Sequence, residues 1–257
     1  MAKITYIEHT NKKYIVEVSN NMTVMEGAVQ NNIPGIDADC GGSMACLAAT
    51  VFFFLERGSV APEWKISITV AGLVTGIAFM HSMYMINIWA ATGDSPIIYR
   101  YIDWLITMPL LALQFYLILS AVRKVSSIIF WKLLIGTLVI VFGGYAGEAG
   151  YILPFLGFVI WMGGWIYILY ELYPGEAGKL VLRSTNRALV TAFETMRMIV
   201  TIGWAIYPLG YVFGTLTGGV DFNTLNIIYN LADFVNKIAF SLVIWVAATA
   251  NTSASRR

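Results

Sequence analysis

Hydrophobic and polar residues follow two different patterns along this chain. Residues 1–43 mix both kinds, whereas nearly everything after Met44 is apolar. The first stretch, MAKITYIEHTNKKYIVEV, alternates apolar and polar positions on both sides of Asn11-Lys12, which predicts a β-hairpin. Thr23 stands three residues before Glu26, a spacing typical of a capped helix start. We therefore expect a small α/β-like segment in front of a long apolar region.

The apolar region divides into blocks that predict membrane-spanning helices. A span needs about 20 mostly apolar residues, and six blocks are close to that length: Ile66–Trp89, Tyr99–Val122, Ile128–Tyr145, Tyr151–Leu172, Ala188–Val212 and Leu225–Ala248. A seventh block, Met44–Leu55, is short. We favour a span there, because the Gly41-Gly42 stretch would extend the helix; otherwise six helices remain. The fold class predicted is an all-α membrane protein, a seven-helix bundle whose first helix is short.

Charged residues between the blocks predict the orientation. The loops and tail that hold ten of the 16 Lys and Arg residues alternate with loops that hold none. Basic loops stay in the cytoplasm, so the C-terminus is predicted to be cytoplasmic, and the N-terminus external if Met44–Leu55 spans. The basic set is Arg57, Lys65, Arg123, Lys124, Lys132, Lys179, Arg183, Arg187, Arg256 and Arg257, and the other loops carry Asp94, Glu148 and Asp221.

Composition supports this interpretation and removes other classes. Hydrophobic residues make up 58% of the chain and charged residues 12%, against about 45–50% and about 25% in an ordinary soluble domain. A soluble protein of this composition would expose apolar surface and aggregate. The net charge of +1 implies no polyanionic partner such as nucleic acid, and two cysteines permit no disulfide framework. No apolar leader follows Met1, so no signal peptide is predicted.

Ionisable residues inside the predicted spans are the strongest sign of a site. Lys237 lies in the middle of the last block, and Asp233 is one helical turn before it on the same face. The Tyr99–Val122 block, in RYIDWLITMPL, holds a further carboxylate, a cation and a hydroxyl, and the Ile66–Trp89 block holds a histidine: Asp103, Arg100, Thr107 and His81. Charges at this depth are expensive and are functional by default.

Two interpretations of these residues are open. They are either polar pairs that hold helices together, or a buried cationic site with two carboxylate counter-ions and a histidine. We favour the second, which suits a proton relay or a lysine held as a Schiff base, because burial favours the neutral amine from which an imine forms. Four aromatic residues either line a ligand pocket or pack the membrane core, and the residues alone do not separate these two: Trp104, Trp165, Trp204 and Tyr207.

From about Leu47 onward the chain resembles a microbial rhodopsin, close to the proteorhodopsin branch. The matching stretches are TVFFFLER, WKISITVAGLVTGIAF, TGDSPIIYRYIDWLITMPLL, GWAIYPLGY and NIIYNLADFVNKIAF. The resemblance implies a seven-helix protein that carries all-trans retinal on Lys237 as a protonated Schiff base. It implies a retinal pocket made by Trp104, Leu111, Trp165, Trp204, Tyr207 and Pro208, with Leu111 at the colour-tuning position of the green-absorbing type.

The same resemblance implies roles for the ionisable residues. Asp103 would be the primary counter-ion and proton acceptor, Asp233 the second counter-ion, and His81 a hydrogen-bond partner of Asp103. Arg100 would lie on the extracellular release side and Glu148 near the outer surface. Light would then drive one proton outward, from Lys237 to Asp103, and the lysine nitrogen would be reset from the cytoplasm.

Gln114 is a departure from the family pattern. It stands eleven residues after Asp103, where the family usually has a carboxylic proton donor. A carboxamide cannot release a proton near neutral pH, so we expect slow, pH-dependent reprotonation by uptake from water. Sodium pumps also carry Gln there, but they have Asn and Asp at the positions of Asp103 and Thr107. Chloride pumps need a neutral residue at the position of Asp103.

Residues 1–46 resemble a truncated adrenodoxin-type 2Fe–2S ferredoxin. The stretches are MAKITYIEH and TVMEGAVQNNIPGIDADCGG, and the family's ligand pattern begins C-x5-C-x2-C. Cys40 and Cys46 match its first two positions, but Ala49 occupies the third and no further cysteine follows. A cluster needs four thiolates, so no 2Fe–2S cluster is expected. We favour free thiols, with a disulfide as the alternative if the segment is extracellular.

These observations predict three parts: a ferredoxin-like fragment over 1–43, a retinal-binding bundle over 44–250 and a cytoplasmic tail over 251–257. The expected function is a light-driven outward proton pump rather than an enzyme. A retinal photosensor is the alternative, although no transducer domain or signalling tail follows Ala248. A membrane-anchored electron carrier conflicts with the missing cysteines. A bacterial inner membrane is the expected location, the lipid bilayer the expected partner, and a homo-pentamer or hexamer the state that the family implies.

Overall fold

The computed structural model describes residues 2–7, 12–19, 24–31, 33–34, 45–92 and 97–255. Several positions used above lie outside these described residues, so the predictions made for them are not addressed by the structure: Asn11, Thr23, Cys40, Gly41, Gly42, Asp94, Arg256 and Arg257.

The N-terminal segment contains the predicted hairpin and helix. Strands β1 (Ala2–Ile7) and β2 (Lys13–Val18) pair in antiparallel register, and α1 (Val24–Gln30) follows them. A small apolar cluster of Tyr6, Ala28 and Ile33 joins the sheet to the helix. The Tyr6 hydroxyl also donates a hydrogen bond of 2.5 Å to the Val24 carbonyl. The alternating pattern therefore folds as expected, around its own small core.

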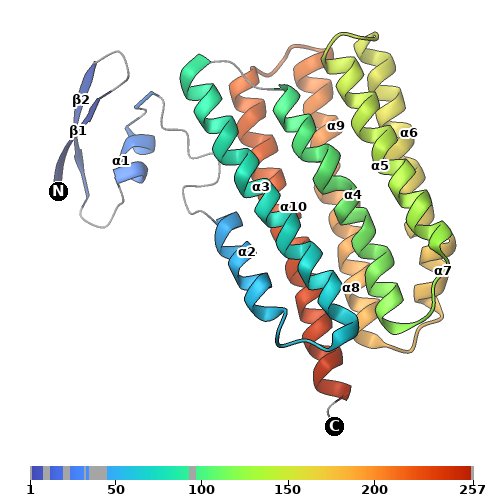
Figure 1. Ribbon diagram of the computed structural model, residues 1–257. Coiled ribbons are helices and arrows are strands. Elements are labelled where there is room, and N and C mark those ends of the chain that lie inside the picture. Colours follow the sequence, from blue (N-terminus) through green and yellow to red (C-terminus); the bar gives the residue numbers. More distant parts are fainter. Residues whose placement is uncertain are drawn as a thin grey trace.

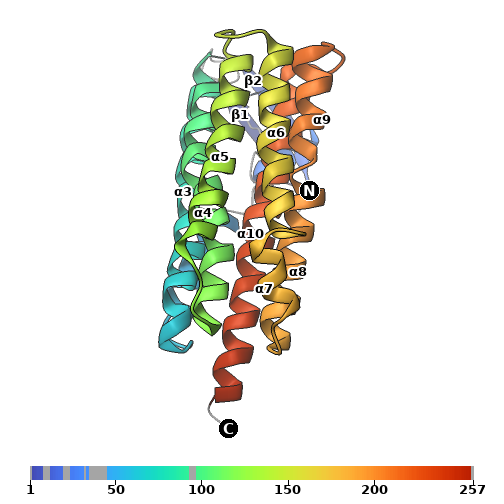
Figure 2. The same ribbon diagram turned by 90° about the vertical axis from the view of Figure 1, so that its right-hand side faces the viewer.

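The remainder is a bundle of long helices that lie side by side (Figures 1 and 2). In the described part of the chain, six helical segments are long and apolar enough to cross a membrane. They confirm the six long apolar blocks, and the last helix runs several residues beyond its predicted end. The longest elements are α3 (Lys65–Thr92), α4 (Ile97–Val122), α5 (Ser127–Glu148), α6 (Pro154–Leu172) and α10 (Phe222–Ser255).

The remaining long segment, Arg187–Leu216, consists of four consecutive pieces. Helix α8 (Arg187–Met198) continues through a π-helical segment η2 (Ile199–Gly203), helix α9 (Ile206–Tyr211) and a second π-helical segment η3 (Val212–Leu216). Pro208 has no N–H to donate, and π-helical turns occur often at functional sites. This segment is therefore irregular where it passes the buried polar residues described below.

Helix α2 (Ala45–Glu56) is shorter than the other spans. Its 12 residues measure about 18 Å at 1.5 Å per residue, against a hydrocarbon core of about 30 Å. Two hydrogen bonds attach it to its neighbours: Thr50 to Thr75 of α3 at 3.0 Å, and Trp245 of α10 to Glu56 at 2.9 Å. The described helix is thus too short for the full seventh span that we favoured, and its extension through Gly41-Gly42 lies outside the described residues.

A groove lies on this side of the bundle. It is bordered by residues of α2, α3 and α4: Thr50, Phe54, Gly72, Leu73, Gly76, Ile77, Met80, His81 and Ile106. The His81 side chain, which is 21% exposed, is the ionisable group in this border.

Helices α5 and α6 approach each other at paired glycines. A Cβ atom placed on Gly157 of α6 would lie 2.6 Å from the Gly147 Cα of α5. Small residues of this kind let membrane helices pack backbone against backbone. The seam holds the upper part of these two helices together.

A short helix that the sequence pattern did not predict, α7 (Glu176–Leu182), follows α6 (Figure 2). Lys132 of α5 forms ion pairs with Glu171 at 3.4 Å and with Glu176 at 3.2 Å. Glu171 is buried and accepts a hydrogen bond from the Ala177 amide. Ion pairs and the buried apolar residues Ala177 and Val181 both attach this turn to the bundle.

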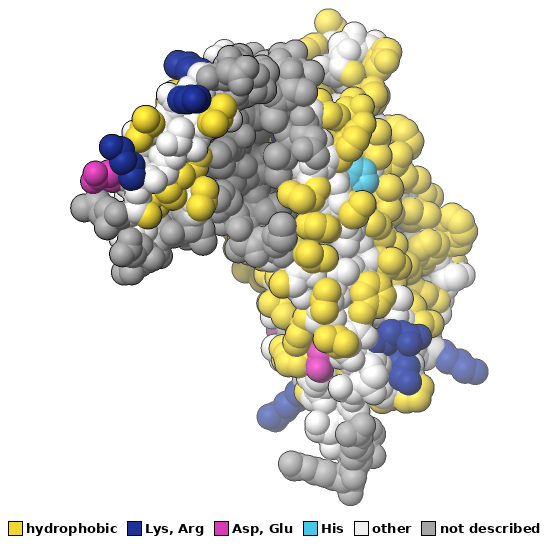
Figure 3. Space-filling model, turned by 60° about the vertical axis from the view of Figure 1, so that its left-hand side comes forward, with side chains coloured by type: hydrophobic (Ala, Val, Ile, Leu, Met, Phe, Trp, Pro, Cys, Tyr) yellow, Lys and Arg dark blue, Asp and Glu magenta, His cyan; other side chains and the backbone are white. Residues whose placement is uncertain are grey.

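The loops after α2, α4 and α6–α7 lie at the same end of the bundle as the C-terminus (Figure 1). Figure 3 shows Lys and Arg side chains gathered at the lower end of the bundle, below a broad hydrophobic flank. The charge distribution that predicts a cytoplasmic end is therefore present in three dimensions.

Candidate functional site

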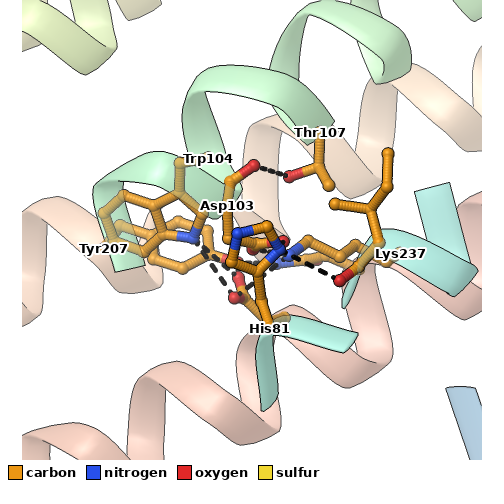
Figure 4. Close-up of polar contacts among 9 residues, drawn as sticks. His81, Asp103, Trp104, Thr107, Tyr207 and Lys237 are labelled. Atoms are coloured by element: carbon orange, nitrogen blue, oxygen red, sulfur yellow. Dashed lines mark hydrogen bonds and ion pairs between the residues drawn. The ribbon is translucent and has the colours of Figure 1, made fainter. Parts of the chain in front are cut away.

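Lys237 is buried in the centre of the bundle between two carboxylates (Figure 4). Its Nζ atom donates hydrogen bonds to Asp103 Oδ2 from α4 and to Asp233 Oδ2, 3.2 Å away on its own helix. A buried charge is tolerated only when it is paired and hydrogen-bonded. The structure thus brings together the three ionisable residues that the sequence pattern singled out first.

The two carboxylates have different surroundings. Asp233 accepts hydrogen bonds from the Trp104 Nε1 atom, 3.2 Å from both oxygens, and from the Tyr207 hydroxyl at 2.5 Å. Asp103 is more deeply buried, and its Oδ1 atom has no hydrogen-bond partner within the described residues. Asp233 is thus held by neutral donors from α4 and α9, whereas Asp103 has an oxygen available to a proton.

His81 does not form the hydrogen bond to Asp103 that the resemblance implies, and Thr107 bonds only the backbone of Asp103. The His81 Nδ1 atom lies 3.8 Å from Asp103 Oδ1, too far for a hydrogen bond, and 3.2 Å from the Ile77 carbonyl one turn earlier. The Thr107 hydroxyl donates to the backbone carbonyl of Asp103 at 2.9 Å, not to its carboxylate. Both residues border Asp103, but in this structure neither is hydrogen-bonded to its carboxylate.

A small apolar cavity lies against the Lys237 side chain. Aromatic and aliphatic side chains make most of its wall, and polar groups gather at the lysine: Trp104, Met108, Leu111, Trp161, Trp204, Tyr207, Asp233, Asn236 and Lys237. Pockets for small organic molecules are lined in this way, with few polar groups and a largely apolar surface.

Five of the residues predicted for a ligand pocket or a counter-ion therefore line the cavity with Lys237, and three do not, Asp103 being one of them. Trp161 occupies the place that we expected for Trp165, whose Nε1 atom donates to the Val200 carbonyl at 3.1 Å. Pro208 is buried but does not line the cavity.

Met108, Trp161 and Asn236 are residues that sequence reasoning missed. Asn236 donates to the Tyr207 hydroxyl at 3.3 Å, and a Cβ atom on Gly203 would lie 1.8 Å from its Oδ1 atom. Asn236 directly precedes Lys237 in an apolar block, and this position could have identified it as a site residue. Trp161 stands one turn before Trp165, so only packing decides which ring faces the cavity.

Arg100 and Glu148 lie away from the lysine, toward the end of the bundle opposite the basic loops. The Arg100 guanidinium is buried and its carbon lies 5.0 Å from the centre of the Tyr229 ring. Glu148 accepts a hydrogen bond of 3.3 Å from Thr215. These residues form a separate polar group beyond Asp103.

Gln114 is fully buried on the other side of Asp103, toward the basic end. Its Nε2 atom donates to the Ser67 carbonyl of α3 at 3.1 Å. Within the described residues, no group of three or more His, Cys, Asp or Glu side chains could hold a metal ion.

The architecture and the site agree with the comparisons with known proteins. Residues 40–251 match the family described as bacteriorhodopsin-like proteins, and the chain belongs to this family of microbial rhodopsins. It is 53% identical over 209 residues to the blue-light absorbing proteorhodopsin of Gamma-proteobacterium Hot 75m4, covering 80% of this chain and 83% of that protein. Identity is also 53%, over 210 residues, to the green-light absorbing proteorhodopsin of Gamma-proteobacterium EBAC31A08, covering 81% and 84%.

A solved structure leads to the same family. The crystal structure of blue light-absorbing proteorhodopsin from Med12 superimposes with a TM-score of 0.72 at 46% identity, covering 84% of this chain and 98% of that one. A separate similarity covers 25% of the chain: it is 38% identical over 64 residues to the 2Fe-2S ferredoxin CtmE of Castellaniella defragrans, of which 53% is covered. Both resemblances stated from the sequence are thus confirmed.

Proposed function

We propose that this protein is a light-driven outward proton pump that binds all-trans retinal covalently at Lys237. The observation that carries the proposal is the placement of the Lys237 nitrogen between Asp103 and Asp233 at the edge of an apolar, aromatic cavity. Membership of the rhodopsin family and the 53% identity to proteorhodopsins support it.

The residues present fit this cofactor. Retinal is an apolar polyene with one reactive carbonyl, and the cavity offers aromatic walls with a single amine among its lining residues. Trp104, Trp161, Trp204 and Leu111 would hold the polyene, and Lys237 would bind its end as an imine. When bound, retinal would supply the absorption of visible light and a light-driven fall in the proton affinity of the lysine nitrogen.

Asp103 would take the proton from the lysine nitrogen. It is in direct contact with Lys237 Nζ, and its second carboxylate oxygen has no hydrogen-bond partner among the described side chains and backbone. Hydrogen bonds from Trp104 and Tyr207 hold Asp233 as the charged partner throughout. We assign the acceptor role to Asp103 and the second counter-ion role to Asp233.

The direction of transport follows from the two ends of the bundle. Arg100 and Glu148 lie beyond Asp103, away from the basic loops, and we propose that they carry the proton to the outer surface. The basic loops and the C-terminus would face the cytoplasm of a bacterial inner membrane. Gln114 lies on that cytoplasmic side and cannot donate a proton. The lysine nitrogen would thus be reprotonated slowly, from water.

The test is to express the chain with all-trans retinal and to illuminate unbuffered cells. We expect a visible absorption band and acidification of the medium that a protonophore abolishes. The Lys237→Ala variant should lack the band. A colourless wild-type product, or a band that survives Lys237→Ala, would overturn the retinal assignment.

Gln114 also favours a second candidate function, a slow-cycling retinal photosensor. Slow return to the ground state prolongs a light-activated form and limits the number of protons moved. In the same experiment, a coloured and photoactive protein that leaves the external pH unchanged would support the sensor and reject the pump.

A further inference from the structure

The side chain of Asn236, which directly precedes Lys237 on α10, is buried and takes no part in the proton transfer described above. Asparagine is mostly an exposed residue, and a buried amide is costly unless it is hydrogen-bonded. The Asn236 Nδ2 atom lies 3.3 Å from the Tyr207 hydroxyl. This contact joins α10 to α9 at the level of the lysine.

The direction of this hydrogen bond follows from the other partner of Tyr207. The Tyr207 hydroxyl lies 2.5 Å from Asp233 Oδ1. An ionised carboxylate only accepts hydrogen bonds, and a hydroxyl has a single proton to donate. Tyr207 therefore donates to Asp233 and accepts from Asn236, which fixes the amide nitrogen on the side of the hydroxyl. The hydrogen bonds run one way, from Asn236 through Tyr207 to Asp233.

The oxygen of the Asn236 amide lies against a glycine. A Cβ atom on Gly203 would be 1.8 Å from Asn236 Oδ1, closer than two such atoms can approach. Gly203 is the last residue of the π-helical segment η2, and π-helical turns occur often at functional sites. The backbone of η2 thus leaves room for the amide, and it holds the amide against Tyr207.

The effect of this arrangement falls on Asp233. Because the amide donates to the Tyr207 oxygen, the hydroxyl proton stays directed at the carboxylate. A hydrogen bond to a carboxylate stabilises its charged form. In a buried chain each hydrogen bond also polarises the next, so Asn236 strengthens the bond that Asp233 receives. The same carboxylate accepts a hydrogen bond from Lys237 at 3.2 Å.

We propose that Asn236 is a positioning residue that keeps Asp233 charged and so directs the lysine proton to Asp103. The inference rests on the proposed pump function, and it gives a reason why only one of the two carboxylates is the acceptor. The proton leaves the Lys237 nitrogen and arrives on a carboxylate oxygen of Asp103. Asn236 neither takes nor gives a proton, and it acts through the Tyr207 hydroxyl.

Infrared difference spectroscopy of the retinal-loaded protein tests this role through Asn236→Leu, which keeps a similar shape and removes the donor. We expect the share of the proton that reaches Asp233 to rise about tenfold, the effect of weakening one hydrogen bond to a charged group. A protonated carboxyl band that disappears on Asp233→Asn measures this share. The absorption maximum should move to shorter wavelength, because a less satisfied Asp233 charge interacts more strongly with the lysine nitrogen.

Three further variants separate this role from simple packing. Asn251→Leu is the matched control, since it makes the same change on the same helix at a residue that bonds Asn186 instead, and it should change neither band. Gly203→Ala displaces the amide without altering Asn236, and it should shift both bands in the same direction. In a Tyr207→Phe background, Asn236→Leu should have no further effect, because the hydroxyl through which it acts is gone.

A second readout needs no retinal. The infrared C–O stretching band of Tyr207, identified by its loss in Tyr207→Phe, reports the hydrogen bonds of that hydroxyl in the retinal-free protein. We expect the band to shift in Asn236→Leu and in Gly203→Ala, and to stay in place in Asn251→Leu.

An unchanged Tyr207 band in Asn236→Leu, or an effect of this substitution that persists in the Tyr207→Phe background, overturns the proposal. If the tyrosine band responds as expected but the wild type forms no pigment or moves no protons, the failure belongs to the proposed function instead.

Discussion

The two carboxylates at Lys237 illustrate how one residue type takes two roles. Asp233 is surrounded by the donors of Trp104 and Tyr207, so its negative charge is satisfied without the lysine. Asp103 depends on Lys237 for its hydrogen bond. We therefore expect Asp103, rather than Asp233, to take a proton that leaves the lysine.

We predict that Asp103→Asn keeps the pigment but stops transport. The amide still fills the space, while the negative charge that stabilises the protonated nitrogen in the ground state is gone, so the absorption band should move to longer wavelength. Absorption spectroscopy and light-induced pH changes in cells measure both effects. Continued acidification by this variant would contradict the acceptor assignment.

Gln114→Glu should speed recovery after a flash. A carboxylic acid at this position can donate a proton that the amide cannot. In the wild type, uptake from water should slow recovery about tenfold for each unit of rising pH, because it is first order in protons. The variant should show a flatter dependence. Recovery traces across a pH series decide this, and a flat wild-type profile would argue against the missing donor.

At the scale of elements, the seam between α5 and α6 depends on the absence of side chains. Gly157→Ala would place a methyl group against the Gly147 backbone, where neither helix can yield easily. We expect this variant to lose about 1–3 kcal/mol of stability through overpacking. Gly163, on the same helix, is the matched control, since a Cβ atom there meets nothing within 4 Å. Midpoints of thermal bleaching should fall for the first variant only.

Helix α2 depends on polar contacts for its attachment. Glu56→Ala removes the acceptor of the Trp245 Nε1 atom. Leaving that indole N–H without its partner should cost about 1–3 kcal/mol. Glu63→Ala, an exposed acidic residue a few positions later, should leave thermal bleaching unchanged. Equal stability of the two variants would show that this contact does not hold the helix.

At the scale of the whole molecule, the N-terminal segment has its own apolar cluster, formed by Tyr6, Ala28 and Ile33. We predict that removing residues 1–34 leaves the absorption band and recovery rate unchanged, because none of the described residues in this segment lines the cavity at Lys237. Spectra of the shortened chain measure this. Loss of the pigment would show that the ferredoxin-like segment supports the bundle.

Much of this architecture could be predicted from the chain. Apolar length located six spans, and the cost of charge in a membrane pointed to Lys237, Asp103 and Asp233 without any structure. Local patterns could not choose Trp161 over Trp165, because both lie on one apolar helix and only packing selects the ring at the cavity. Helix α7 escaped prediction because its 7 residues are too few to show a helical period, and contacts with other helices, including ion pairs from Lys132, position it.

The sequence also could not predict that the buried Ser241 hydroxyl has no hydrogen-bond partner within the described residues. A serine in an apolar block gives the same pattern whether or not its hydroxyl is bonded. Local sequence therefore predicts which helices form and which charges are buried. Contacts between distant segments decide which neighbours those charges have.

The groove beside α2 has a consequence for the surroundings of Lys237. It is bordered by α2, α3 and α4 and includes His81, so in a bilayer we expect lipid chains to lie along it, close to Asp103. Membrane thickness changes how deeply such an opening lies in the bilayer. We expect the absorption band to differ measurably between thin and thick lipid bilayers. The lipid composition of the host membrane would then shift the wavelength of light that the protein absorbs best.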